Sequence, residues 1–389
     1  MASSSKSSPE GERPQRTRPD AAADPAIERR KAEHLRIAAE EDIETRRAPG
    51  WDDVHLVHDA LPVTDASRVD LSTRLLGHEL ALPLVIAGMT GGHAGAERVN
   101  ATLADAAARH GIGIGVGSQR AALRDPSLRG TYAVVRARAP KAFVIANVGI
   151  SQLVAQDDGA PLGAKDIRTL IEMVGANAIA LHLNYLEESV QPEGQTRASG
   201  IDAAIRRLVR QSRVPVIAKE TGAGISGAVA KRLKALGVKA IDVGGVGGTS
   251  FAAIEAMRAT ERGDAARASL GRAFRDWGLP SAVAVAGSVR SGLPVIATGG
   301  VRSGLDAAKA LALGATAVAV GRPMLQAALE GPDGVDRWIA QFALELRTAT
   351  FLAGVARARD LAMRAPVVTG DTRAWIEQLG YASRAGRRA

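Results

Sequence analysis

The chain is predicted to be an α/β protein, a (β/α)₈ TIM barrel with an N-terminal helical extension and a disordered N-terminal tail. Three observations predict this fold. Short aliphatic runs alternate with Ala- and Leu-rich stretches of helical character, they recur at intervals of roughly thirty residues, and there are eight of them. Continuous apolar strands that alternate with helices are typical of a parallel sheet covered on both faces, and eight units fit a closed barrel better than an open sheet.

The predicted strands are the aliphatic runs themselves. In chain order they read PLVIA (83–87), IGIGV (112–116), FVIAN (143–147), AIALH (178–182), PVIAK (215–219), KAIDV (239–243), PVIAT (294–298) and AVAV (317–320). Because the active site of such a barrel is built from residues that follow the strands, these eight strand ends are where functional side chains are expected.

The segments outside the barrel differ in composition. The first 25 residues are rich in Ser, Pro, Arg and Asp and contain almost no large apolar side chain, which predicts disorder. From Ala26 onward, Ile27, Leu35 and Ile37 recur among charged residues at helical spacing, which predicts an amphipathic helix packed on the domain. The predicted organisation is a tail (1–25), an N-terminal helix and extension over the barrel (26–82), the barrel (83–370), and a C-terminal helix with a basic tail (371–389).

Composition narrows the functional class. The chain is 46% hydrophobic but only 3% aromatic, as expected for a barrel packed with small branched side chains. It has no cysteine, which excludes disulfides, thiol nucleophiles and thiolate metal sites. Its net charge of +9 comes from scattered arginines without a basic run interleaved with aromatics, so no nucleic-acid partner is expected. Without an apolar leader or a bilayer-length apolar run, no membrane association is expected and the cytoplasm is the expected location.

The strongest local signal is the segment 297–325, ATGGVRSGLDAAKALALGATAVAVGRPML. One strand ends in Gly299-Gly300 and the next in Gly321-Arg322, each before a helix. Glycines let backbone amides approach an anion, and helix N-termini add positive potential. These loops after strands seven and eight are therefore predicted to cradle a phosphate. A long segment after strand six, residues 244–293, is expected to cover the site.

Polar residues follow the other strands. Ser118, Asn147, His182, Asn184 and Lys219 must converge if the barrel is correct. Lys219 is compatible with a structural cation, a Schiff-base nucleophile or a partner for an electron-rich cofactor.

Two carboxylates follow the fourth strand. Glu187 and Glu188, together with His182 and Asn184, suit a hard cation such as magnesium, although a solvated acidic loop fits the same spacing.

Several sequence motifs of the chain, and the order in which they occur, resemble those of the type 2 isopentenyl diphosphate isomerases. These are FMN-dependent (β/α)₈ enzymes of isoprenoid biosynthesis. The resemblance extends from Arg29 to about Leu361 and rests on RKAEH, GMTGG, GVGSQR, HLN, QPEG, AKE (the family has VKE), DVGGVGGTSF, DWGLP and GGVRSGLDAAKALALGA. It implies reversible movement of a double bond without net oxidation, with NADPH needed only to reduce the flavin. It also implies a homotetramer or homo-octamer.

The resemblance implies a role for individual residues. The implied FMN contacts are Ala87, Gly88, Met89, Thr90, Ser118, Asn147, Lys219 and Thr249, with the phosphate at Gly299, Gly300, Arg302, Gly321 and Arg322. The implied contacts of the substrate, isopentenyl diphosphate, are Arg30, Lys31, His34, Ser118, Gln119, Arg120 and Asn184, supported by His182. Glu188 would hold Mg²⁺, and Glu187 and His182 are the candidate catalytic residues.

One position departs from the family pattern. The family usually has Gln before the magnesium-binding Glu, in HLNxxQE, whereas this chain reads HLNYLEE with Glu187 at that place. The departure leaves two alternatives: a flavin enzyme acting on another prenyl or phosphorylated substrate, or a non-catalytic FMN-binding homologue. Hydride transfer of the hydroxy-acid oxidase type is disfavoured, because such enzymes need a His near strand seven and no His follows His182.

Overall fold

The structure is a computed structural model that describes residues 25–157 and 159–381. The predicted disordered tail up to residue 24 and the basic end from residue 382 lie outside the described residues. Within the described ranges, none of the helices combines the length and the apolar character needed to span a bilayer.

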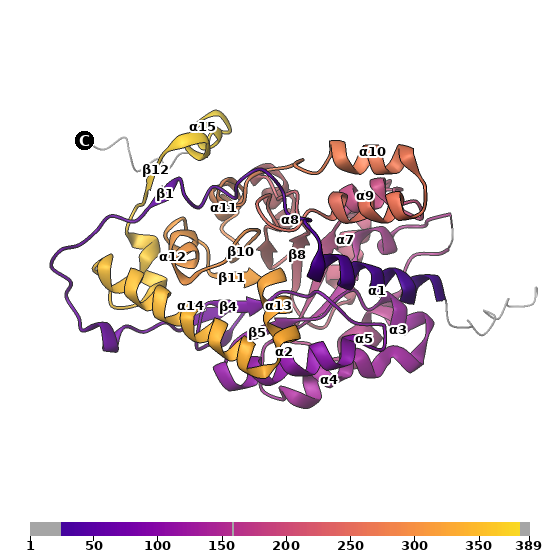
Figure 1. The fold of residues 1–389 in the computed structure, drawn as a ribbon, viewed down its shortest axis with the longest axis horizontal. Coiled ribbons are helices and arrows are strands. Elements are labelled where there is room, and N and C mark those ends of the chain that lie inside the picture. Colours follow the sequence, from indigo (N-terminus) through magenta and orange to yellow (C-terminus); the bar gives the residue numbers. More distant parts are fainter. Residues whose placement is uncertain (1–24, 158, 382–389) are drawn as a thin grey trace, which may run out of the picture.

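Eight parallel strands close into a barrel in the order β10-β11-β4-β5-β6-β7-β8-β9 (Figure 1). All eight predicted strands are confirmed. Closure is made by β4, which pairs with β5 on one side and with β11 on the other. The strands are β4 (Leu84–Ile86), β5 (Gly113–Gly115), β6 (Val144–Gly149), β7 (Ala178–Leu183), β8 (Val216–Glu220), β9 (Ala240–Asp242), β10 (Val295–Thr298) and β11 (Ala317–Val320).

Helices surround the barrel on the outside (Figure 1). The α-helices of the ring are α2 (Ala96–His110), α3 (Arg120–Arg124), α4 (Gly130–Arg138), α5 (Ala164–Met173), α6 (Tyr185–Val190), α7 (Ile201–Gln211), α8 (Gly227–Ala235), α9 (Phe251–Glu261), α10 (Ala265–Ala273), α11 (Ser281–Ser288), α12 (Gly304–Ala312), α13 (Arg322–Glu330) and α14 (Pro332–Leu352). Short 3₁₀ helices are η1 (Ala66–Arg68), η2 (Pro126–Arg129), η3 (Ile150–Leu153), η4 (Val289–Ser291) and η5 (Ala358–Met363).

The core has two layers because successive side chains of a strand point to opposite faces. One cluster, which includes Val85, Ile145, Ala180, Ile217 and Ile296, contains side chains from alternating strand positions. A larger cluster joins the outward-facing strand residues to the helices. The small side chains that dominate the composition fill the barrel with no central channel, which leaves function to the loops at the strand ends.

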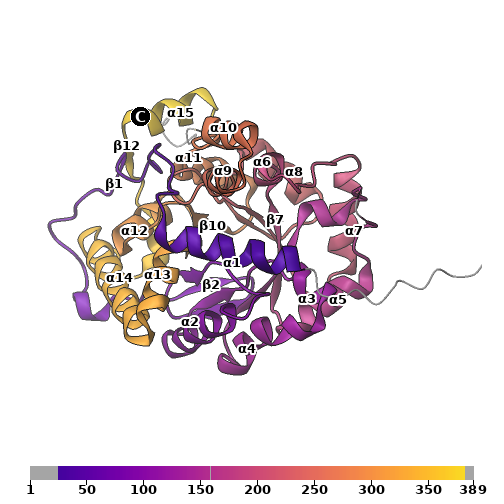
Figure 2. The same cartoon turned by 45° about the vertical axis from the view of Figure 1, so that its right-hand side comes forward.

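The N-terminal extension crosses the end of the barrel where the strands terminate. Helix α1 (Pro25–Glu40) lies in front of the strands in Figure 2 and contacts α9 and α13. Its Ile37 is fully buried in a cluster with Ile43 and Ile254. The extension continues through the pair β2 (Thr73–Leu75) and β3 (His78–Leu80), and β1 (Val54–His55) pairs with β12 (Val367–Val368) before α15 (Gly370–Gln378).

The long segment after β9 forms helices of its own. Residues 244–293 contain α9, α10 and α11, and α9 packs on α6 and α10. Gly244, Gly248, Thr249 and Phe251, near the start of this segment, line the cavity described below. The segment therefore borders the expected site, and its packed helices form one wall of the cavity.

Candidate active site

A cavity of ≈ 290 Å³ lies at the carboxyl ends of the barrel strands, beneath α1. Every one of the eight strands contributes a residue at or just after its end, and α1 contributes Arg30, Lys31 and His34. Polar groups that are far apart in the sequence therefore face one volume. This is the position where (β/α)₈ barrels carry their active sites.

The turns after β10 and β11 form a cradle of backbone amides. Gly299 and Gly300 have φ of 108° and 65°, and a Cβ added at Gly300 would lie 2.3 Å from the carbonyl oxygen of Gly247. A Cβ added at Gly321 would meet only ordinary van der Waals contacts, the nearest being Met89 Sδ at 3.7 Å. Among the described residues, the N–H groups of Gly300 and Gly321 donate to no backbone carbonyl. With the N-terminus of α13 beside them, they suit a phosphate group.

Two arginines of the cradle connect it to the N-terminal extension. Arg302 Nη2 lies 2.6 Å from Glu44 Oε2, and Arg322 Nη1 lies 3.2 Å from Glu44 Oε1. Arg322 also donates to the carbonyl oxygens of Ala38 and Glu41, at 2.9 and 2.8 Å, where α1 ends. Cations near the last carbonyls of a helix satisfy their lone pairs and interact well with its dipole. The two guanidinium groups thus fix α1 over the cradle.

Lys219 lies at the end of β8 with a defined partner. Its Nζ is 3.1 Å from Asp242 Oδ2, and Asp242 Oδ1 accepts a hydrogen bond of 2.6 Å from Thr298. Both charged side chains are largely buried, at 13% and 8% exposure. A buried ion pair of this kind holds the ammonium in one place at the floor of the cavity.

His182 is neutral and held in one tautomer. Burial lowers its pKa to about 3, with Lys219 and Lys31 adding to the effect. Its Nδ1 lies 2.7 Å from Asn147 Oδ1, and the Asn147 amide is oriented by the bond from Nδ2 to the carbonyl oxygen of Val116. Nδ1 must therefore carry the proton, which leaves Nε2 as an acceptor.

Lys31 is buried beneath α1. Its Nζ donates to the carbonyl oxygens of Gly91 and Ser118 and to the Tyr132 hydroxyl, at 2.6, 2.7 and 2.5 Å. Burial, and then the neighbouring Arg30, lower the pKa of Lys31 to about 7, whereas the three oxygen acceptors favour the ammonium. These three acceptors fix the ammonium in position.

The two adjacent glutamates after β7 differ in environment. Glu188 accepts hydrogen bonds from Ser151 Oγ (3.1 Å), Asn184 Nδ2 (3.3 Å) and the backbone N–H of Gln195 (2.7 Å). Glu187 accepts one from Asn184 Nδ2 at 3.0 Å. Burial raises the pKa of Glu187 to about 8, and the nearby carboxylates of Glu255 and Glu188 add to the rise. Near neutral pH Glu187 therefore carries a proton much of the time.

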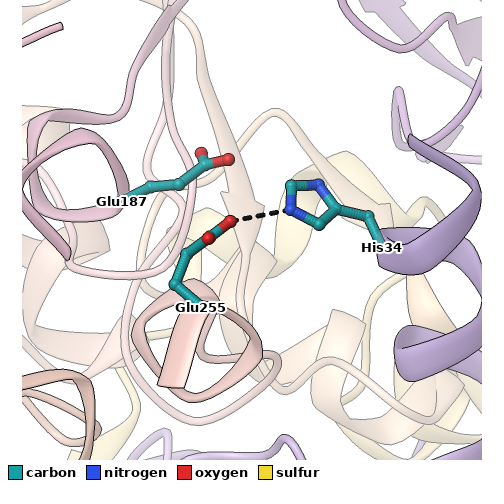
Figure 3. Close-up of side chains that lie close together, drawn as sticks. All are labelled: His34, Glu187 and Glu255. Atoms are coloured by element: carbon teal, nitrogen blue, oxygen red, sulfur yellow. Dashed lines mark hydrogen bonds and ion pairs between the residues drawn. The ribbon is translucent and has the colours of Figure 1, made fainter. Parts of the chain in front are cut away.

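A buried ionic network joins α1 to α9. Arg258, whose side chain is fully buried, contacts Glu255 at 2.5 Å and both Glu33 and Glu193 at 3.0 Å. Glu255 Oε1 also lies 2.7 Å from His34 Nε2 (Figure 3). Burial lowers the pKa of His34, so its imidazole is predominantly neutral.

Comparison with known proteins decides the family. Residues 23–125 and 143–367 match the family model described as FMN-dependent dehydrogenase. Proteins named isopentenyl-diphosphate delta-isomerase are 48% identical in Methanoregula boonei, over 90% of this chain and 96% of that protein, and 45% identical in Archaeoglobus fulgidus, over 90% and 99%. The chain belongs to the FMN-dependent, type 2 isopentenyl diphosphate isomerase family.

The barrel of this isomerase family member is shared with more distant proteins described as oxidases. A lactate oxidase of Pediococcus acidilactici is similar with a TM-score of 0.62 and 19% identity, covering 89% of this chain and 94% of that chain. A mandelate oxidase variant with an FMN adduct gives a TM-score of 0.55 at 20% identity, covering 87% and 92%. At such identities the likeness shows the fold alone.

Most residues implied by the family resemblance meet in the one cavity. Those that line it are Arg30, Lys31, His34, Ala87, Gly88, Met89, Thr90, Ser118, Arg120, Asn147, His182, Asn184, Glu187, Glu188, Lys219, Thr249, Gly299, Gly300, Arg302, Gly321 and Arg322. Gln119 is the exception. It is fully buried outside the lining, donates to the carbonyl oxygen of Leu170 at 3.0 Å and accepts from the backbone N–H of Asn147 at 2.9 Å. We therefore propose that Gln119 positions Asn147 and does not itself contact the substrate.

Several polar residues of the site in this isomerase family member were not predicted from the sequence. Glu44, Asp242, Glu255 and Arg258 all hold functional side chains in place through the contacts given above. A signal existed for Glu255 and Arg258, since both are charged residues in the otherwise apolar stretch FAAIEAMRA. A charge on the buried face of a helix needs a partner, but the stretch does not say which.

Proposed function

We propose that this chain isomerises isopentenyl diphosphate to dimethylallyl diphosphate, with FMN as its cofactor and without net oxidation. The observation that carries the proposal is that one cavity contains two regions suited to anions. The amide cradle after β10 and β11 is one, and the cationic side chains of Arg30, Lys31 and Arg120 line the same cavity from α1 and α3. A flavin mononucleotide needs one phosphate site, and a diphosphate substrate needs a second.

The residues present fit FMN. Gly300 and Gly321 both line the cavity, and the positive φ of Gly299 and Gly300 forms the tight turn after β10. Lys219, held by Asp242, would lie at the ring, where an ammonium stabilises negative charge on a reduced flavin. When bound, reduced FMN would supply an electron-rich surface that stabilises cationic character on the alkene and exchanges a proton with it.

The protein side chains would bind the substrate and stabilise the negative charge of its diphosphate. Arg30 and Arg120 suit the diphosphate because a guanidinium can donate two parallel hydrogen bonds, and Lys31 adds a fixed cation beside them. Neutral His182 presents Nε2 as a hydrogen-bond acceptor, and we expect it to share a proton with the diphosphate end. Helix α1 above the cavity would exclude water from the reacting carbons.

Glu187 is the proposed substitute for the glutamine of related enzymes. Because burial keeps its carboxyl protonated near neutral pH, it can donate a hydrogen bond as an amide does. A protonated carboxyl can also give up or regain that proton, which an amide cannot. Glu187 and His182 are therefore the proposed catalytic residues, and Glu188 is the proposed Mg²⁺ ligand.

Other functional assignments stay predictions of the resemblance. They are NADPH as the reductant of the flavin, a homotetramer or homo-octamer, and a cytoplasmic location.

The test is an anaerobic assay of the purified protein with FMN, NADPH, Mg²⁺ and isopentenyl diphosphate, following dimethylallyl diphosphate. We expect turnover that stops when the flavin is kept oxidised. Glu187→Gln is assayed beside it, because it restores the family residue. Activity in the variant but none in the natural protein would contradict the proposal and indicate another prenyl or phosphorylated substrate.

A further inference from the structure

Three potential metal ligands from three different elements meet at one wall of the cavity. His34 comes from α1, Glu187 from α6 and Glu255 from α9. One ligand atom of each lies within 4.8 Å of the ligand atoms of the other two. Figure 3 shows the imidazole and both carboxylates pointing toward one another. A nitrogen and two carboxylate oxygens thus face a shared small volume.

The local charge favours a cation at this point. Among the described residues Glu187 forms no ion pair, and Asn184 Nδ2 is its hydrogen-bond donor. Glu255 is paired with Arg258, but that guanidinium also contacts Glu33 and Glu193. Glu33 and Glu193 are also paired with Arg262, so Glu187 is the carboxyl of this wall that lacks an ion-pair partner among the described residues. A bound metal would supply that partner and displace the proton of Glu187.

A neutral oxygen lies at the same wall. Asn184 is 4% exposed, and its Oδ1 has no hydrogen-bond partner among the described residues, although its Nδ2 contacts both Glu187 and Glu188. Buried polar atoms without partners are uncommon in folded proteins and call for an explanation such as an ion or a ligand. Asn184 lines the same cavity as Glu187, so this acceptor is open to a cation that binds there.

We propose that His34, Glu187 and Glu255 bind a divalent first-row transition cation, such as Zn²⁺ or Co²⁺, at a site separate from the Mg²⁺ site proposed at Glu188. Asn184 Oδ1 or water would complete the coordination.

The spacing suits such an ion after a small adjustment. Zinc binds His nitrogen and carboxylate oxygen at about 2.0–2.2 Å, so two ligand atoms on one ion are roughly 3–3.5 Å apart. His34 Nε2 and Glu255 Oε1 are now 2.7 Å apart, as a hydrogen bond requires. They must separate by less than about 1 Å, and Glu187 must move toward them by a similar amount. His34 must present a bare nitrogen and Glu187 a carboxylate, so binding releases the proton that now joins His34 to Glu255 and the proton of Glu187.

The donor set also selects the class of metal. Imidazole with carboxylate suits Zn²⁺, Co²⁺ and their neighbours, whereas Mg²⁺ prefers oxygen ligands and retains several waters. Glu188 has only oxygen ligand atoms and lies beside the Ser151 hydroxyl, as suits a magnesium site. The two adjacent glutamates would therefore serve different cations.

The test uses the full chain without a polyhistidine tag, treated with a chelator and then titrated with Co²⁺. We expect one equivalent to bind with visible d–d absorption bands, to be displaced by Zn²⁺, and to resist a large excess of Mg²⁺. Glu187→Gln and His34→Gln are close in shape to the natural residues, and each should weaken binding on the order of 100-fold or more. Cation binding is measured on the resting protein, so the result is independent of whether isopentenyl diphosphate turns over.

Glu188→Gln is the matched control, because it removes the same charge from the adjacent residue of the same helix. Because Glu188 shares Asn184 with Glu187, its loss should weaken Co²⁺ binding somewhat, but much less than Glu187→Gln does, and should leave the absorption bands in place. Absence of the absorption bands would overturn the proposal. So would equal loss in Glu187→Gln and Glu188→Gln, which would indicate one shared site, or unchanged binding in both Glu187→Gln and His34→Gln, which would place the metal elsewhere.

Discussion

A buried carboxylate, Asp242, sets how much positive charge the floor of the cavity presents. It lies 3.1 Å from Lys219 Nζ and is itself held by Thr298, so the ammonium and the carboxylate act as one unit. In a site of low dielectric constant, removal of either charge changes the potential felt by a bound flavin. Removal of the Lys219 ammonium and removal of the Asp242 carboxylate change this potential in opposite directions.

We predict that Asp242→Asn raises the midpoint potential of bound FMN and that Lys219→Met lowers it. The physical reason is that reduced flavin gains negative charge. In Asp242→Asn the Lys219 ammonium stabilises this charge without an opposing carboxylate, whereas in Lys219→Met the ammonium is absent. Each shift should be roughly 30 mV or more, about 1.4 kcal/mol for a two-electron couple. Spectroelectrochemical titration measures both. Shifts of the same sign would show that the pair does not act on the ring.

Glu220, the last residue of β8, links stability to pH. Burial raises its pKa from 4.5 to about 7, against the opposing hydrogen bonds from the backbone of Gly222, Gly224 and Ala223. Between these two values the folded state keeps a proton that the unfolded state has lost. Stability must therefore fall as the pH rises from 4.5 to about 7, with the full cost present above that range.

The corresponding prediction concerns Glu220→Gln, which cannot ionise. Relative to the natural protein, the variant should gain up to roughly 3 kcal/mol of unfolding free energy between pH 4.5 and 7. Urea denaturation at several pH values measures the difference. Parallel stability curves for the two proteins would rule out Glu220 as the source.

Individual residues were predictable where the strand end fixes their position. Asn147, His182 and Lys219 end strands whose aliphatic runs are unambiguous, so the barrel brings them together. Gln119 was not predictable in the same way, because it follows a short strand and its side chain turns outward to the carbonyl oxygen of Leu170. The direction of one side chain in a loop depends on packing partners distant in the sequence, which a linear pattern does not contain.

At the scale of elements, the contact between α1 and α9 depends on Arg258. Its fully buried guanidinium joins Glu33 of α1, Glu255 of its own helix and Glu193 of the loop after α6. A buried charge that loses its partner is costly, because the remaining charges stay away from water.

We predict that Arg258→Met lowers the unfolding free energy by about 3–5 kcal/mol. Arg337→Met is the control, since Arg337 and its partner Glu330 are 69% and 64% exposed, and an exposed pair contributes at most about 1 kcal/mol. Urea denaturation compares the three proteins. Similar midpoints for the two variants would mean that the network adds nothing to stability.

The strands were better predicted than the helices that close the site. The strands carry short aliphatic runs because they are buried on both faces, with polar residues gathered toward their carboxyl ends. The segment 244–293 was predicted only as a covering loop, yet it forms α9, α10 and α11. Its helices are short, and their ends are set by caps such as Ser250 and Asp264, whose side chains accept backbone N–H groups. Such local bonds are easier to recognise once the helix is known.

For the whole molecule, the phosphate cradle predicts how ligands change stability. FMN at 100 times its dissociation constant should stabilise the folded state by about 2.7 kcal/mol. Riboflavin has the same ring but no phosphate, so at equal concentration it should raise the melting temperature much less. Thermal unfolding followed by circular dichroism measures both. Equal shifts would show that the turns after β10 and β11 do not hold the phosphate.

Because β4 pairs with β11, the barrel cannot close until late in synthesis on the ribosome. Strand β4 emerges early, at residues 84–86, but its second neighbour ends at Val320. Until then the growing chain has two open strand edges, and such edges invite pairing with other chains. The pair β1 and β12 forms later still, when residue 368 has been made. The nascent chain therefore exposes both edges until β11 has been made, and only then does closure of the barrel remove them.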